Sequence, residues 1–415
     1  MTFSLAASHS KGKFATDKIF GASGAAALAT TKYGKEKVVN ATIGAFMDEK
    51  EVLACIPTVE KVLRNIPIND MISYAPIAGL PKYLESAIDL TFADSRPEAY
   101  IDAVATAGGT GVIHHTIWNY SEVGDTVITS DWYWGPYQAL CEEALRHLDT
   151  FTLFDENQNF NTAAFAAKVN SVLSKQNNLI IIINAPAHNP TGYSLTDSEW
   201  EQVIAVCKEQ AKNPDKRIIL LVDIAYLDFA GEKNTCRTFL KQFGSLPANI
   251  LTVLAFSMSK GYTMYGQRTG AMIGVSSDKD VIREFVDINQ FTSRATWSNI
   301  NRGAMSLLAT IYQDKTILAQ VEQERSAFFQ LIRIRADIFM REAQESGLNM
   351  LPYRAGFFLT IPAKDPDAVC EKLHDDLIYA VPLGKGVRIA VCAVPSNKIT
   401  GMAGKVLKAI SVVDK

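Results

Sequence analysis

Apolar runs separated by amphipathic segments dominate this chain from about residue 100 onward. Four of the runs have the length of strands buried on both faces, and they cover residues 179–184, 217–223, 250–256 and 270–275. Segments with helical spacing lie between strands, and shorter strands are expected at residues 38–44, 101–106, 125–130 and 150–154. Strands that alternate with helices of this length predict an α/β fold with a mainly parallel sheet covered by helices.

The two ends of the chain have a different pattern from the middle. Residues 1–35 predict an irregular arm with a short helix at about 22–29, and residues 349–415 predict a small α/β unit. Residues 316–346 have the apolar spacing of one helix that ends at Gly347. At 1.5 Å per residue that helix would be about 45 Å long, so we expect it to bridge two domains.

Composition and charge argue against several classes of protein. The formal net charge of −3, with both signs spread along the chain, gives no electrostatic case for nucleic acid or an anionic membrane. No apolar stretch reaches the roughly 18–20 residues that span a bilayer, and the beginning of the chain lacks the apolar core of a signal peptide. The six cysteines form no Cys-x-x-Cys pair, which argues against zinc and fits a reducing compartment. We therefore expect a cytoplasmic protein without a metal.

The stretch 257–268 carries the first candidate chemistry. Lys260 follows the apolar run 250–256, where a charge is costly unless it is used or lost. Lysine forms Schiff bases with aldehydes once its pKa is depressed, and the neighbouring hydroxyls with Arg268 suit a phosphate. Pyridoxal phosphate is an aldehyde that carries a phosphate. A surface lysine in a turn rich in serine and glycine explains the same residues, so this stretch alone does not decide.

Polar residues at the ends of other predicted strands add to the case, since ligands bind outside the carboxyl ends of strands in an open α/β sheet. Residues 108–111 form a glycine-rich turn that opens a helix, which suits a phosphate, but they complete no nucleotide-binding motif. Asp223 ends an apolar strand, so it either pairs with a protonated pyridine nitrogen or serves as a helix cap or structural ion pair. Arg388, inside an apolar run, needs an acid of the protein or a substrate carboxylate. Trp134 suits stacking on a flat ring as well as plain core packing.

Three motifs occur in order and in register: His-Asn-Pro-Thr-Gly at 188–192, Asp-x-Ala-Tyr at 223–226, and Ser-x-Ser-Lys at 257–260 followed by Arg268. With them the chain resembles the pyridoxal-phosphate-dependent aminotransferases of fold type I, nearest the aspartate and aromatic amino acid aminotransferases. The likeness runs from about Asp17 to Arg388, most of the chain. It implies a homodimer with active sites at its interface. It also implies two domains, which are a large three-layer α/β/α domain at residues 50–325 and a small α/β domain built from residues 1–49 and 326–415.

The resemblance implies a catalytic role for three residues. Lys260 would bind the cofactor aldehyde covalently and move the proton at the substrate Cα. Asp223 would pair with the pyridine nitrogen. Tyr226 would hydrogen-bond the ring oxygen together with Asn189, which stabilises its anionic form.

Further matching residues would hold the cofactor and the substrate. Trp134 would stack on the ring. The phosphate would be held by Gly109, Thr110, Ser257 and Arg268, more weakly by Ser259, and by Tyr74 of the partner subunit. The substrate would be held by Gly44 and Arg388 at its α-carboxylate, and by Arg294 of the partner subunit at a side-chain carboxylate.

The chain departs from the family in two places. Tyr137 stands where a histidine usually follows the stacking tryptophan, so the surroundings of Asp223 differ. Ile300 and Asn301 stand in place of the usual prolines near Arg294, and Arg302 lies close by. Because aromatic aminotransferases can retain this arginine and swing it aside, Arg294 does not by itself identify the substrate.

These motifs predict an aminotransferase that moves an amino group from an L-amino acid, acidic or aromatic, to a 2-oxo acid such as 2-oxoglutarate. The reaction would be ping-pong and would use pyridoxal phosphate. A fold type I enzyme with another reaction, such as a β-eliminating C–S lyase, would use the same cofactor residues. A cofactor-binding regulator without turnover would usually carry a helix-turn-helix module, of which neither the arm nor the net charge gives a sign.

Overall fold

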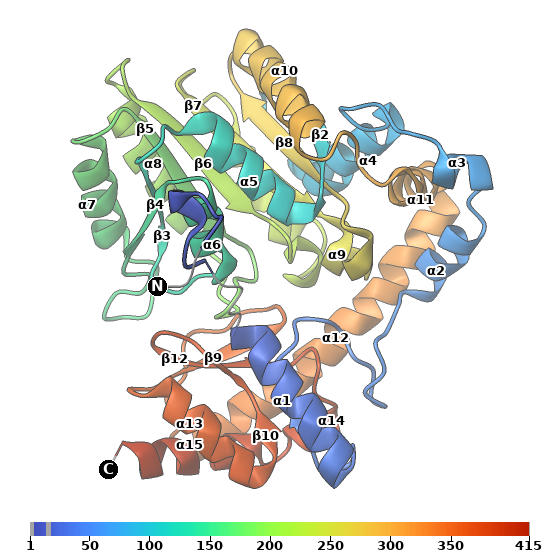
Figure 1. Cartoon of the computed structure of the whole chain (residues 1–415), viewed down its shortest axis with the longest axis vertical. Helices are drawn as coiled ribbons and strands as arrows, with labels where there is room; N and C mark the ends of the chain where they lie inside the picture. Colours follow the sequence, from blue (N-terminus) through green and yellow to red (C-terminus); the bar gives the residue numbers. More distant parts are fainter. Residues whose placement is uncertain (1–3, 14–17, 415) are drawn as a thin grey trace.

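A seven-stranded sheet forms the centre of the larger part of the molecule (Figure 1). The computed structural model describes residues 4–13 and 18–414, so Asp17, where the family likeness begins, lies outside the described residues. The strand order is β2-β8-β7-β6-β5-β3-β4. Within this sheet β8 runs antiparallel to both of its neighbours, and the other paired strands are parallel. The prediction of a mainly parallel sheet is confirmed. The strands are β2 (Tyr100–Thr106), β3 (Thr126–Ser130), β4 (His147–Phe151), β5 (Asn178–Asn184), β6 (Arg217–Asp223), β7 (Ile250–Ser257) and β8 (Gly270–Ser276).

Helices cover both faces of this sheet because its central strands are apolar on both sides. On β5, Ile180 and Ile182 belong to one core cluster, whereas Ile181 and Ile183 belong to the cluster on the opposite face. This alternation explains the continuous apolar run in the sequence and makes the three-layer α/β/α arrangement. The first face is covered by α5 (Gly108–Tyr120), α6 (Pro136–Glu143) and α10 (Lys279–Thr296), and the second by α4 (Pro81–Phe92), α7 (Thr162–Leu173), α8 (Asp197–Ala211) and α11 (Arg302–Gln313).

The smaller part of the molecule is built from both ends of the chain. The two-residue strands β1 (Val39–Asn40) and β10 (Ile378–Tyr379) pair in parallel, which joins the N-terminal segment to the C-terminal unit. A second sheet of this part is antiparallel and has the order β11-β12-β9. The remaining elements are β9 (Phe358–Pro362), β11 (Val381–Pro382), β12 (Gly386–Ala390), α1 (Lys18–Tyr33), α13 (Pro366–Leu373), α14 (Ser396–Ile399) and α15 (Met402–Val413).

The helix α12 (Lys315–Ser346) connects the two parts (Figure 1). Its 32 residues give it a length of about 48 Å at 1.5 Å per residue. Leu318 and Val321, near its start, pack in the core of the larger part, and Ile332 and Phe339 pack in the core of the smaller part. These separate cores support our proposal of a large domain at 50–325 and a small domain at 1–49 with 326–415.

Three predicted elements differ from the structure. The N-terminal arm contains the 16-residue helix α1, which the sequence hides because its buried residues are the small side chains Ala26 and Ala29. The strand expected at 38–44 is limited to β1. In the residues after it, backbone carbonyl groups accept hydrogen bonds from a lysine and an arginine side chain instead of pairing with another strand. The strand expected at 150–154 lies at 147–151, where it pairs with β3 as an edge strand and buries only Phe151 fully.

Residues 51–64 have helical spacing, and Pro57 within them marks either a kink or a late start of the helix; in the structure the helix starts late. Pro57 is the first residue of α2 (Pro57–Arg64), a position that needs no amide hydrogen bond. Two further short helices are α3 (Ile68–Ile72) and α9 (Met258–Gly261). No helix in the described part of the chain is long and apolar enough to cross a membrane. Residues 4–13 and 18–414 also contain no group of three or more His, Cys, Asp or Glu side chains that could hold a metal ion.

Candidate active site

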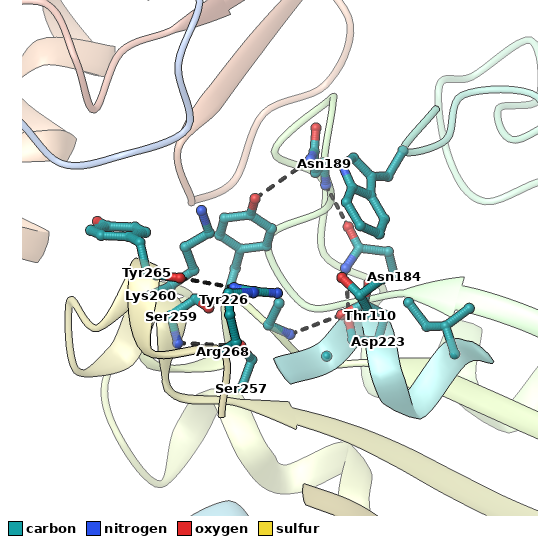
Figure 2. A pocket seen from close by; sticks show the side chains of 14 residues that line it. Thr110, Asn184, Asn189, Asp223, Tyr226, Ser257, Ser259, Lys260, Tyr265 and Arg268 are labelled. Atoms are coloured by element: carbon teal, nitrogen blue, oxygen red, sulfur yellow. Dashed lines mark hydrogen bonds between the residues drawn. The ribbon is translucent and has the colours of Figure 1, made fainter. Parts of the chain in front are cut away.

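A cavity of about 200 Å³ lies at the carboxyl ends of β5, β6 and β7, where the sheet meets the smaller part of the molecule. Figure 2 shows the side chains that line it, with Lys260 and Arg268 on one side and Asn189 and Asp223 on the other. The structure brings together ten of the residues singled out in the sequence, which are Gly109, Thr110, Trp134, Asn189, Asp223, Tyr226, Ser257, Ser259, Lys260 and Arg268.

Lys260 reaches this cavity from α9, the short helix that follows β7. Ser257 ends β7 and caps α9, because its hydroxyl accepts a hydrogen bond from the Ser259 amide at 3.2 Å. The Lys260 Nζ atom donates to the Gly44 carbonyl at 2.5 Å. A Cβ atom on residue 44 would lie 2.5 Å from the Phe358 ring, so glycine lets the backbone come this close. The predicted residue Gly44 therefore contacts the lysine rather than lining the cavity.

Burial lowers the pKa of Lys260 from 10.5 to about 8. Repulsion by Arg388 and Arg268 contributes to this lowering, whereas Cys392 and Asp223 act against it. The rings of Tyr265 and Tyr226 lie 4.8 and 5.7 Å from Nζ and contribute little polar solvation. A fraction of the amine is therefore uncharged near neutral pH and can act as a nucleophile.

In the protein freed of bound small molecules, we expect Lys260 to form a Schiff base with a small aldehyde at a rate that depends on pH. This rate should rise as the pH passes through about 8. Only the uncharged amine attacks, and its fraction levels off above the pKa. Trapping with cyanoborohydride followed by mass spectrometry measures the rate at this residue. A lysine in a model peptide, with a pKa of about 10.4, serves as the reference. A Lys260 rate that keeps rising in parallel with the peptide up to pH 10 would contradict the prediction.

Asp223 faces the cavity from the end of β6 and is buried. Its Oδ2 atom accepts a hydrogen bond from the Tyr137 hydroxyl at 2.7 Å, and its Oδ1 atom accepts one from the Ala225 amide at 3.1 Å. Burial raises the pKa of this carboxyl, and the Tyr137 and Ala225 donors and the charge of Lys260 counteract the rise. Burial and the neighbouring carboxylate also raise the pKa of Tyr137 well above its usual value, so its hydroxyl stays protonated as a donor. Asp223 therefore offers a buried acceptor to a cationic group in the cavity.

The opposite end of the cavity suits an anion. Arg268 has a left-handed backbone with φ of 48°, and its Nη1 atom donates to the Tyr265 carbonyl at 2.8 Å and to the Ser259 hydroxyl at 3.3 Å. A Cβ atom on Gly108 would lie 2.7 Å from Nη2, so glycine allows the guanidinium to lie against the first residues of α5. The amide groups at a helix N-terminus, an arginine and the hydroxyl of Thr110 form a set of phosphate donors.

Asn189 and Arg388 connect the cavity to the smaller part of the molecule. The Asn189 Nδ2 atom donates to the Tyr226 hydroxyl at 3.4 Å, and its Oδ1 atom accepts from Arg388 Nη1 at 3.2 Å. Arg388 Nη2 also donates to the Thr42 carbonyl at 2.8 Å. The guanidinium thus lies 4.2 Å above the Phe358 ring and next to the amide that faces the cavity.

Besides Gly44 and Arg388, two further predicted residues do not line the cavity of their own chain. Tyr74 is 88% exposed, and Arg294 is exposed with its guanidinium donating to the Ser298 hydroxyl. Sequence reasoning also missed four lining residues, which are Ile113, Asn184, Ala225 and Tyr265. Asn184 carried a usable signal, because it is the polar end of the apolar run that forms β5.

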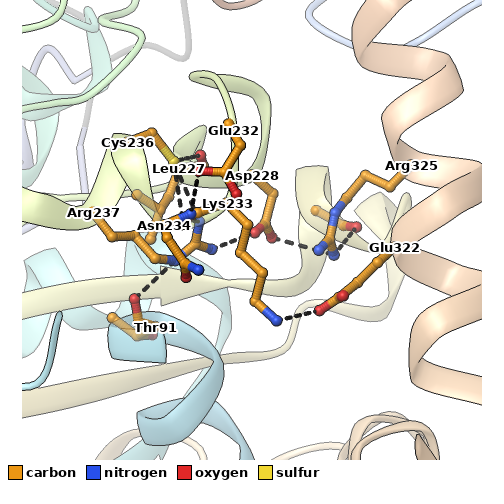
Figure 3. A network of polar contacts seen from close by, with 11 residues as sticks. Thr91, Leu227, Asp228, Glu232, Lys233, Asn234, Cys236, Arg237, Glu322 and Arg325 are labelled. Atoms are coloured by element: carbon orange, nitrogen blue, oxygen red, sulfur yellow. Dashed lines mark hydrogen bonds and ion pairs between the residues drawn. The ribbon is translucent and has the colours of Figure 1, made fainter. Parts of the chain in front are cut away.

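A buried ionic network is centred on Asp228 (Figure 3). Asp228, in the short helix η3 (Leu227–Phe229), pairs with Arg237 of η4 (Thr235–Phe243) at 2.6 Å and with Arg325 of α12 at 3.5 Å. Arg325 Nη1 also donates to the Gly261 carbonyl at 3.3 Å. Burial opposes the charge of Asp228, but the two arginines outweigh it and hold the pKa of this carboxyl below its ordinary value. The network therefore ties α9, which carries Lys260, to the helix that connects the two parts.

Replacing Arg325 by methionine is expected to lower the free energy of unfolding by about 2 kcal/mol, because Asp228 stays buried with only one arginine. Urea denaturation followed by circular dichroism measures the change. Arg64→Met is the matched control, since Arg64 pairs with Glu60 on the exposed surface of α2, and we expect a change within about 0.5 kcal/mol. Equal changes in the two variants would show that the buried network does not stabilise the protein.

Comparison with known proteins adds three findings. The family model described as aminotransferase class I and II matches residues 36–406. The cytoplasmic aspartate aminotransferase of Dictyostelium discoideum is 25% identical over 392 residues, covering 90% of this chain and 84% of the relative. The aromatic-amino-acid aminotransferase of Escherichia coli is 23% identical over 337 residues, covering 77% of this chain and 81% of the relative.

Solved structures are similar over nearly the whole chain. The crystal structure of an aminotransferase from Anaerococcus prevotii superposes with a TM-score of 0.96 at 36% identity, covering 98% of this chain and 100% of that one. The aromatic-amino-acid aminotransferase of Burkholderia pseudomallei, covalently bound to pyridoxal phosphate, superposes with a TM-score of 0.79 at 22% identity, covering 98% and 100%. At that identity the second likeness supports the fold alone.

Proposed function

From its membership of the aminotransferase class I and II family, which makes this chain a pyridoxal-phosphate-dependent transaminase, we propose that the cavity around Lys260 is its active site. The enzyme moves an amino group between an amino acid and a 2-oxo acid. The observation that carries the assignment of the site is that Lys260, the buried carboxylate of Asp223 and the anion-binding end at Arg268 line one cavity.

The residues of the cavity fit pyridoxal phosphate. When bound, the cofactor supplies an aldehyde carbon for an amine and a ring that accepts electron density while its nitrogen is protonated. Asp223 matches the ring nitrogen, because it is buried and its Tyr137 partner stays a donor. Arg268 and the first residues of α5 offer the donors that a phosphate needs. Gly108 has no side chain, so the Arg268 guanidinium can lie close to the start of α5. Trp134 lines the same cavity and presents a flat face for the ring.

The residues in and beside the cavity then have the following proposed tasks. Lys260 Nζ would hold the aldehyde carbon, and its amine would carry the proton to and from the substrate Cα. Asp223 would keep the ring nitrogen protonated, which is the state in which the ring accepts electron density. Asn189 and Tyr226 donate to the ring oxygen, while Gly109, Thr110, Ser257 and Arg268 hold the phosphate. Arg388 binds the substrate α-carboxylate beside Gly44.

We further propose that two copies of the chain complete each other's sites. Tyr74 and Arg294 do not line the cavity of their own chain, although the family likeness gives them ligand-binding roles. Ile68 and Ile72, on the helix just before Tyr74, are 65% and 71% exposed, which suits a surface that another subunit covers. Tyr74 from a second copy would contact the phosphate, and Arg294 from it a side-chain carboxylate. We also propose a cytoplasmic location, which the name of the Dictyostelium relative supports.

Two-substrate steady-state kinetics test the proposed function. In a ping-pong transaminase the amino group stays on the enzyme between the two half-reactions. Double-reciprocal plots of the rate against the amino acid concentration, each at a different 2-oxo acid concentration, are then parallel lines. We expect this pattern with 2-oxoglutarate as acceptor. Release of ammonia and pyruvate from one β-substituted amino acid, without need for an acceptor, would support a β-eliminating lyase instead. Intersecting lines would contradict the ping-pong reaction.

A further inference from the structure

Asp228 lies on the same short segment as two residues of the proposed active site. Asp223 ends β6, Tyr226 follows three positions later, and Asp228 lies two positions beyond that, in η3. The first two line the cavity, whereas Asp228 does not and is 15% exposed. Figure 3 shows its carboxylate between Arg237 and Arg325. A charge in this place either only stabilises the fold or positions its neighbours.

The carboxylate of Asp228 also packs against the residue that follows Lys260. A Cβ atom on residue 261 would overlap Asp228 Oδ2 and would lie 3.2 Å from Cγ. Gly261 is the last residue of α9 and has no positive φ, so its backbone conformation does not require glycine. The missing side chain is therefore explained by the approach of Asp228, and this contact leaves no space between η3 and α9.

Arg325 holds the same two segments from a third side. Its Nη1 atom donates to the Gly261 carbonyl at 3.3 Å and lies 3.5 Å from Asp228 Oδ2. Its guanidinium carbon also lies 5.5 Å from the centre of the Tyr262 ring. The helix α9 is a single turn of four residues, which has little stability of its own because the first turn of a helix is costly to form. The orientation of α9 therefore depends on contacts such as these.

We propose that Asp228 and Arg325 are positioning residues for Lys260. They set the distance between the amine and the segment that carries Asp223 and Tyr226, which is the distance that the cofactor spans from its aldehyde carbon to its ring nitrogen and ring oxygen. The proposal rests on the proposed function, because it takes those three residues as the ones that act on the cofactor. A displacement of about 1 Å at such a site costs roughly a hundredfold in rate.

Two variants with matched controls test this role. Gly261→Ala adds one methyl group where Asp228 lies and leaves every charge of the network in place, so it tests the proposal even where an Asp228 variant does not fold. Gly266→Ala is its control, since a Cβ atom there would meet no heavy atom within 4 Å. Asp228→Asn removes the charge with little change of shape. Its control is Asp337→Asn, because Asp337 pairs with Arg333 on the exposed surface of α12.

The position of the amine is measured first in the cofactor-free protein. Pyridoxal phosphate and propanal each condense with the amine of Lys260 with loss of water. Borohydride added at set times reduces the product and stops the reaction, and mass spectrometry of the peptide that carries Lys260 gives its amount. Propanal needs only an accessible amine, whereas pyridoxal phosphate is held in the cavity beside it. The ratio of the two rate constants therefore reports where the amine lies.

We expect Gly261→Ala and Asp228→Asn each to lower this ratio by about tenfold, while both controls leave it within about twofold of the parent. A network that only stabilises the fold would give a different result, namely a lower free energy of unfolding with an unchanged ratio. That result in Gly261→Ala would overturn the proposal.

A double variant shows whether Asp228 and Gly261 act through each other. Asp228→Ala removes the oxygen that the added methyl group of Gly261→Ala would meet. In the Asp228→Ala background, Gly261→Ala should therefore lower the ratio by no more than about twofold further. The same loss from Gly261→Ala with and without the carboxylate would overturn the proposal, because the methyl group would then act through some other contact.

The holoenzyme gives a second readout through its first half-reaction, followed by absorbance with the amino acid that the parent converts fastest. Gly261→Ala should lower the maximum rate constant by about tenfold and leave the half-saturating amino acid concentration within about twofold. The reason is that Arg388, the proposed ligand of the substrate carboxylate, is held by Asn189 and Thr42 on other segments. A change confined to the half-saturating concentration would overturn the proposal. If the parent enzyme itself converts no amino acid, the proposed function has failed, and the ratio in the cofactor-free protein still decides the positioning role.

Discussion

Replacing Lys260 by alanine is expected to lower kcat by at least about 10⁴-fold. The amine has two proposed tasks, as the group that binds the aldehyde and as the group that moves the proton at Cα, and alanine can do neither. No neighbouring base replaces it among the described residues that line the cavity, since Asp223 is held by Tyr137 and Ala225 and the remaining ionisable groups there are tyrosines and Arg268.

Steady-state rates with an amino acid and 2-oxoglutarate measure this loss. The visible absorbance of the lysine-bound cofactor should disappear in the same variant, while calorimetry should still detect cofactor binding through Asp223 and Arg268. Lys279→Ala is the control, because Lys279 is an exposed lysine at the start of α10, and it should keep the activity of the parent enzyme. A Lys260→Ala enzyme with more than a hundredth of the parent rate would refute the assignment of the lysine.

Replacing Asp223 by asparagine is expected to lower kcat by about 10³-fold, the second largest effect. Asparagine has nearly the same shape but no charge, so the ring nitrogen loses the group that keeps its proton. The side chain is buried, and in the free protein its negative charge is supported by two hydrogen-bond donors and Lys260. The same kinetic assay measures the effect. A variant that keeps a tenth or more of the parent activity would show that this carboxylate is not needed for chemistry.

Tyr137→Phe is the companion variant for Asp223, because it removes one donor and leaves the carboxylate in place. The hydroxyl of Tyr137 lowers the pKa of Asp223 against the effect of burial, so its loss raises that pKa. Activity needs the ionised carboxylate and falls as the pH falls through its pKa. The acid limb of kcat/KM against pH should therefore move to higher pH in Tyr137→Phe, with a loss of about tenfold at neutral pH. An unmoved acid limb would separate Tyr137 from the ionisation of Asp223.

The sequence pointed to ten of the residues that line the cavity, because several of them end or follow apolar runs and the family resemblance supplied the others. Asp223 ends one apolar run and Lys260 follows another, both of which predict buried strands, and the carboxyl ends of parallel strands meet at one edge of a sheet. Asn184 belongs to the same edge and was overlooked because an asparagine at the end of a strand is also an ordinary turn residue. The helix α1 was predicted too short, at about 22–29, for a different reason, since alanines give little apolar periodicity.

Contacts between distant segments could not be inferred in this way. The hydrogen bond from Lys260 to Gly44 joins residues 216 positions apart, and that from Arg388 to Asn189 joins residues 199 positions apart. Each depends on how the smaller part packs against the sheet, which the apolar pattern of one segment does not contain. The replacement of a histidine by Tyr137 was visible in the sequence, but its hydrogen bond to Asp223 was not.

The sequence by itself determined the α/β fold, the family and the set of polar side chains at the strand ends, because strand periodicity and residue order are local properties. Only the tertiary structure decided the size and lining of the cavity around Lys260, the pairing of Asp228 with Arg237 and Arg325, and the separation of Tyr74 and Arg294 from the cavity of their own chain. A cavity is the space left between segments that are far apart in the chain. Its volume and charge therefore depend on the relative placement of all its walls, and no single stretch of residues encodes that placement.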